Sequence, residues 1–239
     1  MTTVTRTRHR RRGRGFRIMR RVALVVLAVL LVPYLIAPIY RFVEPVSTVM
    51  LWRWLTGARV ERRVVPIGQM GALPRTVIVA EDAAFCGHWG IDWRGIYRAF
   101  QEADDVSGMR GGSTITQQVA KNLFLWQGRS YVRKALELPL ALWIDLVLPK
   151  RRVLEIYLNV AQWGPNGEFG AEAAARHAFG KPVRQVTSHE AALLAAMLPN
   201  PALRSARTPG PAVSRIARIH EARALRAPRL AACLPGARG

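Results

Sequence analysis

The sequence is poor in acidic residues, in cysteine and in aromatic residues. Only 15 Asp and Glu side chains stand against 36 Lys and Arg, which gives a formal net charge of +21 at pH 7. An excess of one sign suggests an anionic partner, such as a phosphate, a pyrophosphate, a nucleic acid or a membrane surface. Arg supplies 32 of the 36 basic residues. The base composition of a gene also produces such a bias, so the positions of the charges carry more weight than their sum.

The two cysteines, Cys86 and Cys233, are too few for a metal-ligand cluster or a dense disulfide framework. An oxidising compartment would permit one bridge between them. Sequence spacing does not show such a bridge, and free structural thiols are the default interpretation.

Aromatic residues make up only 8% of a chain that is 50% hydrophobic, so the apolar content is mainly Ala, Leu and Val. Ala and Leu favour helices more than sheets. No alternating run is long enough for a large sheet, and no internal repeat is present. The predicted fold class is therefore mainly α.

One long uncharged run stands near the N-terminus, at residues 22–40. A helix of this length, at a rise of ~1.5 Å per residue, nearly spans a hydrocarbon core of ~30 Å. Pro33 and Pro38 are tolerated in such helices. A cleaved signal peptide is the alternative, but the tetrapeptide at 35–38, Leu-Ile-Ala-Pro, lacks a convincing small-residue cleavage pattern. We therefore favour an uncleaved transmembrane anchor.

The charge distribution orients this anchor. The first 21 residues hold nine Arg and no acid, and the positive-inside rule keeps such a segment in the cytoplasm. We expect a single-pass protein of the cytoplasmic (inner) membrane with everything after Tyr40 on the periplasmic side. An Arg-rich tail can also bind nucleic acid, but beside a span its topological role is simpler, and we expect no nucleic-acid partner.

Composition divides the chain into five parts. We expect a basic cytoplasmic tail (1–21), the anchor (22–40), a membrane-proximal connector (41–70), a globular domain (71–210) and a basic C-terminal tail (211–239). Apolar spacing and caps predict helices at 113–124, 133–148, 151–160, 171–178 and 190–198. In the connector, Trp52 and Trp54 lie at a lipid interface or pack against the domain, and the sequence favours neither.

Two adjacent acids, Glu81 and Asp82, follow the apolar stretch 77–80. A carboxyl group beside apolar surface has a raised pKa, which suits a general base or acid. Acidic pairs are also common at helix starts and on surfaces. The pair alone therefore does not identify a site.

A second polar segment, 111–122, reads GGSTITQQVAKN. On a helix, Ser113, Gln117 and Lys121 are spaced at i, i+4 and i+8, so they share one face. That face offers a hydroxyl, an amide and a cation to a sugar–phosphate ligand. The spacing is not that of a Walker loop, and a capped polar helix is the plainer interpretation of any one of these residues.

A third segment contains the cations Arg129, Arg133 and Lys134, which could meet a pyrophosphate. Arg133 and Glu137 are four residues apart, but this order supports a helix by only ~0.2–0.5 kcal/mol at best. Stabilisation alone therefore explains the pair poorly. A solvated basic face is the alternative.

Taken together, these segments resemble the peptidoglycan glycosyltransferases of family 51, in particular their monofunctional members. The matching stretches occur in order over about residues 73–205, and the second is the most specific. They are 81–92 (EDAAFCGHWGID), 111–122, 133–137 (RKALE), 155–181 and Asn200-Pro201. Residues 216–239 match the family only loosely.

The resemblance implies a lysozyme-like glycosyltransferase domain that acts on lipid II and the nascent glycan strand beside the membrane. It implies that Glu81 is the general base that deprotonates the GlcNAc 4-hydroxyl, which attacks C1 of the donor MurNAc with inversion. Glu137 would assist at the acceptor or order the cations. The expected substrate-binding residues are Ser113, Gln117, Lys121, Arg129, Arg133 and Lys134.

The same resemblance bears on cofactors and partners. The family sometimes depends on a metal, so a divalent cation, Mg²⁺ or Mn²⁺, is an optional cofactor, although the sequence has no dedicated metal site. Other cell-wall synthesis proteins are candidate partners. The set Ser-x-x-Lys, Ser-x-Asn and Lys-Thr-Gly, which marks a transpeptidase, is absent.

Two other functions compete with this one. A muramidase would share the fold class and would pair two carboxylates, as Glu81 and Glu137 could, but hydrolysis has no need of the cations. A catalytically dead scaffold is disfavoured because all the expected site residues are present. We further expect Lys121→Ala to lose more turnover than Lys150→Ala, since only Lys121 would face the pyrophosphate.

Overall fold

The computed structural model describes residues 6–101, 112–128 and 130–234, and it is mainly helical, as composition predicted. Its α-helices are α1 (Arg6–Ile36), α2 (Thr48–Leu55), α3 (Leu73–Glu81), α4 (Trp93–Gln101), α5 (Ile115–Phe124), α6 (Tyr131–Val147), α7 (Lys150–Val160), α8 (Ala171–Phe179), α9 (Ser188–Met197) and α10 (Pro211–Arg226). Short 3-10 turns are η1 (Ala37–Arg41), η2 (Ile67–Gln69), η3 (Phe85–Gly87), η5 (Val183–Gln185) and η6 (Pro228–Ala231).

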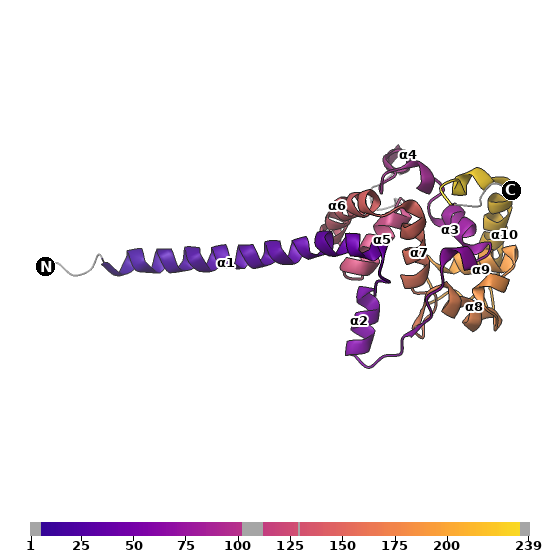
Figure 1. Cartoon of the computed structure of the whole chain (residues 1–239), viewed down its shortest axis with the longest axis horizontal. Helices are drawn as coiled ribbons and strands as arrows, with labels where there is room; N and C mark the ends of the chain where they lie inside the picture. The colour runs from indigo at the N-terminus through magenta and orange to yellow at the C-terminus, as the bar shows by residue number, and fades with distance from the viewer. Residues whose placement is uncertain (1–5, 102–111, 129, 235–239) are drawn as a thin grey trace.

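Helix α1 projects from the body of the protein as one long rod (Figure 1). Among the described residues, Gly15–Arg41 is the one stretch long and apolar enough to cross a membrane, and almost none of it is buried in the body. Its base is nevertheless attached. The Trp143 indole of α6 donates a 2.9 Å hydrogen bond to the Tyr34 carbonyl, and the Tyr40 ring stacks on Phe124 of α5 at 5.9 Å between centroids. The apolar helix therefore docks on the folded body.

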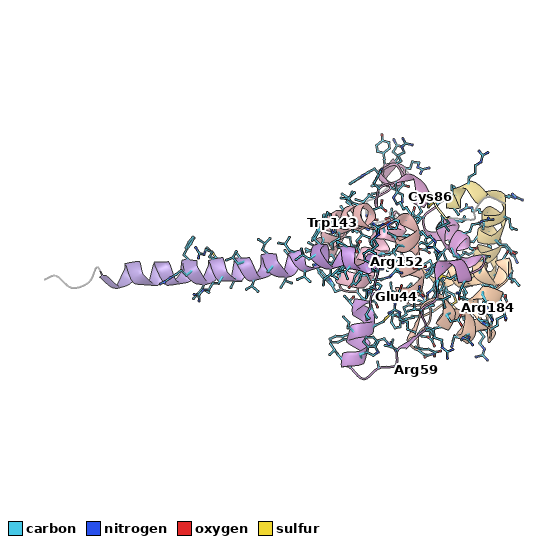
Figure 2. All side chains as sticks on the ribbon, viewed as in Figure 1. Glu44, Arg59, Cys86, Trp143, Arg152 and Arg184 are labelled. Atoms are coloured by element: carbon cyan, nitrogen blue, oxygen red, sulfur yellow. A yellow bond between two sulfur atoms is a disulfide. The ribbon has the colours of Figure 1, made fainter. Side chains whose placement is uncertain are left out.

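The chain after α1 is held against α7 by a single arginine. Arg152 donates to the carbonyl oxygens of Tyr40 (2.8 Å) and Val43 (2.9 Å), and it forms ion pairs with Glu44 and Glu155. Figure 2 shows Arg152 and Glu44 where the base of α1 meets the body. Five donors in a rigid fork let one guanidinium bind several oxygens at once. Arg152 thereby fixes the start of the connector.

The end of the connector joins the body through a two-stranded parallel sheet, β1 (Glu61–Arg62) with β2 (Glu168–Phe169). The Asn159 side chain of α7 then binds both backbone groups of Val65, accepting from its N–H at 3.1 Å and donating to its carbonyl at 3.0 Å. A side-chain amide that mimics a strand partner in this way satisfies backbone groups that would otherwise be unpaired. The connector is thus bonded to the body at both ends.

The tryptophans of the connector do not pack into the domain. Trp52 is 67% exposed and Trp54 is 52% exposed, both on α2. Packing against the domain, one of the two interpretations left open by the sequence, is therefore not observed. A place at a lipid interface stays a prediction.

Two groups of helices share the core. Helix α3 packs against α9 and α10, while α5 packs between α6 and α7. The largest fully buried side chains are Trp163, Tyr157, Phe85 and Phe169. α5 and α9 each begin with a reciprocal capping box, Thr114 with Gln117 and Thr187 with Glu190. Such boxes satisfy free N–H groups of the first turn, which explains why these helices start where they do.

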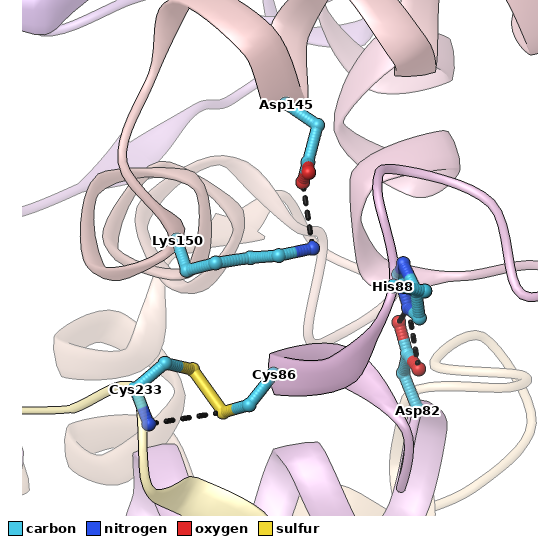
Figure 3. Close-up of a disulfide and its surroundings, with 6 residues drawn as sticks. All are labelled: Asp82, Cys86, His88, Asp145, Lys150 and Cys233. Atoms are coloured by element: carbon cyan, nitrogen blue, oxygen red, sulfur yellow. Dashed lines mark hydrogen bonds and ion pairs between the residues drawn. A yellow bond between two sulfur atoms is a disulfide. The ribbon is translucent and has the colours of Figure 1, made fainter.

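The expectation of a separate basic tail after residue 210 needs correction. Residues 211–226 form α10, which packs against α9 and α3, with Val213, Ala217 and Ala224 buried. The expectation of free thiols is also wrong. Cys86 and Cys233 form a disulfide, with Cα atoms 5.4 Å apart, that joins η3 to the chain after η6 (Figure 3). The two cysteines are 147 positions apart, so only the fold brings them together.

Candidate active site

Glu81 is the last residue of α3, and its carboxylate meets the side of α5. The Gln118 amide donates to Glu81 Oε2 at 2.9 Å, and the Tyr157 hydroxyl of α7 donates to Gln118 Oε1, also at 2.9 Å. Burial raises the pKa of the Glu81 carboxyl, although the Gln118 hydrogen bond and the charges of Lys121 and Arg204 oppose the rise. A carboxylate with a raised pKa and a fixed orientation is suited to accept a proton.

The hydroxyl that supports Gln118 stays protonated. Burial, and after it the negative charge of Glu81, raises the pKa of Tyr157 well above its usual value. The Tyr157 side chain is almost wholly buried in the core. It can therefore serve as a permanent donor that fixes the rotamer of Gln118, and through Gln118 the position of the Glu81 carboxylate.

The neighbouring acid, Asp82, has a structural role. Its carboxylate accepts from the backbone N–H of Ile115 at 2.9 Å and lies 3.0 Å from His88 Nε2 (Figure 3). The negative charge thus lies at the N-terminus of α5, where it is favoured. The Thr114 hydroxyl donates to the Gly90 carbonyl at 2.6 Å, so the start of α5 is bonded both to the end of α3 and to the chain between η3 and α4. Glu81 and Asp82 are therefore not two equivalent site carboxylates.

A set of cations extends from Glu81 along α5 to the start of α6. Lys121 interacts electrostatically with both Glu81 and Arg133, and burial followed by the charge of Arg133 lowers the pKa of Lys121. The pKa of Lys134 is lowered to about 8, first by burial and then by the charges of Arg133 and Lys121. Crowded like charges raise the free energy of one another unless an anion joins them. The group is suited to bind a diphosphate.

Glu137 is the carboxylate that holds two of these cations in place. It is buried, it forms an ion pair with Arg133, and its Oε2 lies 3.0 Å from Lys134 Nζ. Lys134 also donates to the Ser113 hydroxyl at 2.8 Å, and Arg133 donates to the Gly128 carbonyl at 2.9 Å. These contacts are compatible with the expectation that Glu137 orders the cations, and its role in the reaction stays a prediction.

The structure changes the expected arrangement of the second segment. Helix α5 starts at Ile115, so Ser113 precedes the helix and does not share a helical face with Gln117 and Lys121. Gln117 is wholly buried, and its carbonyl oxygen accepts from the Thr114 N–H at 2.9 Å. Gln117 is a buried capping residue, so the expected shared face is not formed, and a contact of Gln117 with the substrate stays a prediction without support from this arrangement. Ser113 remains exposed beside Lys134.

Sequence reasoning missed Gln118 and Tyr157, and one expected residue lies outside the described part of the chain. Arg129 falls in the gap between 128 and 130, so its place relative to the other cations stays a prediction. The pattern Thr114-x-x-Gln117 is a capping box, which fixes the helix start. From that start, Gln118 and Lys121 are three apart and share a face, a signal that was available in the sequence.

The residues of this cluster do not fit a dedicated metal site. In the stretches 6–101, 112–128 and 130–234, no three His, Cys, Asp or Glu side chains gather in a way that could hold a metal ion. Glu137 is already bound by two cations, and Glu81 is bonded to an amide. We therefore derive no chemical step through a divalent cation, and a requirement for Mg²⁺ or Mn²⁺ stays a prediction.

Comparison with known proteins matches the chain to one family. The model of the family described as Transglycosylase matches residues 50–223. A biosynthetic peptidoglycan transglycosylase of Rhodopseudomonas palustris (strain TIE-1) is 58% identical over 218 residues, covering 91% of this chain and 92% of that protein. The protein of the same description from Nitrobacter winogradskyi is 56% identical over 223 residues (93% and 98%), and that from Brucella suis 49% over 212 residues (88% and 94%). The match includes most of α10.

Proposed function

Because the chain belongs to the transglycosylase family and is a peptidoglycan glycosyltransferase with a lysozyme-like domain, we propose that it polymerises lipid II into glycan strands. In this proposal the reaction inverts C1 of MurNAc and releases undecaprenyl diphosphate. The observation that supports the proposal is that the Glu81 carboxylate, held by Gln118, interacts electrostatically with Lys121, which in turn interacts with Arg133 and Lys134.

Glu81 is the proposed general base. It takes the proton of the acceptor GlcNAc 4-hydroxyl while that oxygen bonds to C1 of the donor and the bond from C1 to the diphosphate breaks. The raised pKa increases the proton affinity of Glu81, and such matching typically contributes 10²–10⁴-fold in rate. The chain of hydrogen bonds from Tyr157 through Gln118 supports this role, because it aims the carboxylate before substrate arrives.

The cations Lys121, Arg133 and Lys134 are the proposed diphosphate site, with Arg129 as a further candidate. Negative charge develops on the leaving diphosphate, and fixed cations at that point lower the barrier. Burial, and after it the charge of Arg133, lowers the pKa values of Lys121 and Lys134, so an incoming dianion relieves the repulsion between these cations. Ser113, bonded to Lys134, is placed to add a hydroxyl contact. Glu137 holds Arg133 and Lys134 in position.

Membrane attachment of the domain is the second part of the proposal. Docking of Tyr34 and Tyr40 on α6 and α5 favours an anchor over a leader that is cut away, since cleavage at the end of the apolar stretch Gly15–Arg41 would remove both contacts. Arg residues precede the span, which favours a periplasmic domain on the inner membrane. The exposed Trp52 and Trp54 suit the interface beside it. Other cell-wall synthesis proteins remain proposed partners.

A muramidase is disfavoured by the surroundings of Glu137. A hydrolase needs two carboxyl groups that are free to flank the glycosidic bond, one as the acid and the other as the base or nucleophile. Both oxygens of Glu137 are already occupied, one by Arg133 and the other by Lys134. The pair Glu81 and Glu137 therefore fits a base with an ordered cation site better than it fits two carboxylates that flank a glycosidic bond.

The deciding experiment incubates the purified full chain in detergent with lipid II, and separately with finished glycan. We expect glycan strands from lipid II, no digestion of finished glycan, and a loss of at least about 100-fold in rate for Glu81→Gln. Glu221→Gln, on α10 and paired with His189, is the control and should retain activity. Digestion of finished glycan without polymerisation, or normal polymerisation by Glu81→Gln, would refute the proposal.

A further inference from the structure

A large groove lies beside the catalytic cluster but shares none of its cations. It has a volume of about 1230 Å³ and runs between η3, α4, α6 and the chain around η6. We call it the aromatic groove and define it by Trp89, Trp93, Tyr97, Arg94, Arg98 and Arg229. Its volume exceeds the ~300–1,000 Å³ of a typical small-molecule pocket. It is therefore large enough for several sugar rings.

The aromatic side chains of the groove are open to solvent. Trp89 is 74% exposed, Trp93 60% and Tyr97 63%. Trp93 and Tyr97 are four residues apart on α4, so their rings lie on one helical face. The apolar C–H face of a pyranose packs on such rings, and an aromatic side chain offers this area at low entropic cost. Exposed rings at helical spacing therefore suit a chain of sugars.

Both walls of the groove also carry positive charge. Arg94 and Arg98 lie on α4 and Arg229 on η6, and all three are exposed. Within the described ranges, none of the three forms an ion pair with an acid; Arg98 donates only to the Arg94 carbonyl, at 3.4 Å. A guanidinium binds a carboxylate through two parallel hydrogen bonds. The one acid among the described residues that line the groove, Asp92, accepts from the Gly95 N–H at 2.8 Å and forms no ion pair with these cations.

The wall formed by the C-terminal chain is held by the disulfide. Cys86 lines the groove, and Leu230 and Ala232 line it immediately before Cys233. The backbone N–H of Cys233 donates to Cys86 Sγ at 3.2 Å, which adds to the covalent link. Figure 3 shows this join between η3 and the C-terminal chain. The shape of the groove therefore depends on oxidation of the two thiols.

The position of the groove relates it to both the reaction and the membrane. Ala83 and Ala84, directly after Glu81-Asp82, line the groove, and so does Leu142 of α6, next to the residue that docks on α1. The C-terminal chain, which forms another part of the wall, lies on the far side of the body from α1 (Figure 1). A ligand in the groove therefore lies close to Glu81 and reaches the side of the body that faces away from α1.

We propose that the aromatic groove binds the nascent glycan strand after it leaves the catalytic cluster, with sugar rings on Trp93 and Tyr97 and the carboxylates of the peptide stems on Arg94 and Arg98. This inference rests on the proposed function, because it takes the strand to be the product. An anionic lipid headgroup offers similar charge, but the C-terminal wall faces away from the anchor, which favours a soluble polymer.

The test measures binding of uncross-linked glycan strands, with and without their peptide stems, to the full chain in detergent micelles. Trp93→Ala with Tyr97→Ala should weaken binding of both strands about tenfold. Arg94→Gln with Arg98→Gln should weaken only the stem-bearing strand, also about tenfold. The matched controls are Trp52→Ala on α2 and Arg215→Gln with Arg218→Gln on α10, all exposed outside the groove. They should bind as the wild type does.

Two results would overturn the proposal. One is unchanged strand binding by both groove variants, with thermal melting to show that each is folded. The other is displacement of the strand from the groove by dihexanoyl phosphatidylglycerol, at a concentration lower than the one at which the strand itself binds. Binding needs no turnover, so a protein that binds strands in the groove but consumes no lipid II would refute the proposed function alone.

The disulfide supplies an independent arm of the same test. The double substitution Cys86→Ser with Cys233→Ser frees the C-terminal wall. None of the six residues that define the groove is changed by it. We expect this variant to bind stem-bearing strands several-fold more weakly, and dithiothreitol to reduce wild-type binding to the same degree. Equal binding by oxidised and reduced protein would contradict the proposed role of that wall.

Discussion

Glu81 and Gln118 are 37 positions apart in the sequence, yet the Gln118 amide donates a 2.9 Å hydrogen bond to the Glu81 carboxylate. The oxygen of the same Gln118 amide accepts from the Tyr157 hydroxyl. This second hydrogen bond fixes the orientation of the amide, with its nitrogen toward the Glu81 carboxylate. A neutral donor stabilises the ionised form of Glu81 without the full charge of a salt bridge. This balance sets the pKa of the proposed base between that of an exposed carboxylate and that of an isolated buried one.

Gln118→Ala should shift the pH dependence of the reaction. The Gln118 hydrogen bond lowers the pKa of Glu81, so its loss raises that pKa further. Because the base acts in its ionised form, the acid limb of the kcat/KM profile should move to higher pH, with activity near neutrality also reduced. Gln185→Ala, an exposed change on η5, should leave the limb in place. If the acid limb of Gln118→Ala stayed in place, Glu81 would not be the group that titrates in this limb.

The lowered pKa of Lys134 predicts a basic limb in the pH dependence of the reaction. Its pKa is lowered to about 8, so the cation is present below that pH and is lost as pH rises through it. Affinity for lipid II should therefore fall above about pH 8 through a higher KM. Lys134→Arg keeps its charge to far higher pH and should flatten this fall, even if the altered geometry lowers the rate. A basic limb that is the same in both proteins would exclude Lys134 as its source.

Lys121→Ala should lower kcat by about 10²–10³-fold, the usual cost of removing one preorganised charge from a developing anion. Lys181→Ala, which breaks a surface pair with Glu190, is the matched control and should change kcat less than twofold. The comparison with Lys150 that the sequence suggested is less clean. Lys150 lies 2.7 Å from the buried Asp145, so its removal would destabilise the fold. Equal losses in Lys121→Ala and Lys181→Ala would remove Lys121 from the site.

Asp82→Asn tests the join between α3 and α5. The carboxylate accepts from Ile115 and lies against His88, and loss of buried charged hydrogen bonds costs about 1–3 kcal/mol. Urea unfolding should show a loss in that range. Glu61→Gln, in an exposed pair with Arg59, should stay within about 0.5 kcal/mol. If Asp82→Asn were as stable as the wild type but inactive, Asp82 would belong to the chemistry.

Much of the helical framework could be predicted because local chemistry encodes it. The expected helices at 151–160 and 171–178 correspond to α7 (Lys150–Val160) and α8 (Ala171–Phe179) within a residue. Apolar spacing and end signals decide such segments without reference to distant parts of the chain. Helix α10 was missed because basic residues recur along it and its few buried positions, such as Ala217, are small.

The site was predictable only in part, for a different reason. Motif resemblance identified Glu81, Lys121 and Glu137, and all three lie in the connected cluster. Which residue faces which partner depends on how α3, α5 and α7 meet, and no local signal encodes that. Gln117 and Gln118 are adjacent and chemically identical, yet one caps a helix inside the core and the other holds the proposed base. The bridge between Cys86 and Cys233 likewise depends on the docking of α10.

The attachment of α1 to the body has a consequence for how the enzyme meets its substrate. Trp143 holds the Tyr34 carbonyl, and Arg152 holds the carbonyls of Tyr40 and Val43, so no free hinge separates the helix from α6 and α7. With α1 upright in a bilayer, Glu81 and its cations would stay at one constant height above the lipid surface. The search for a partner molecule then reduces to diffusion within a plane, and lateral crowding rather than bulk concentration would set the frequency of encounters.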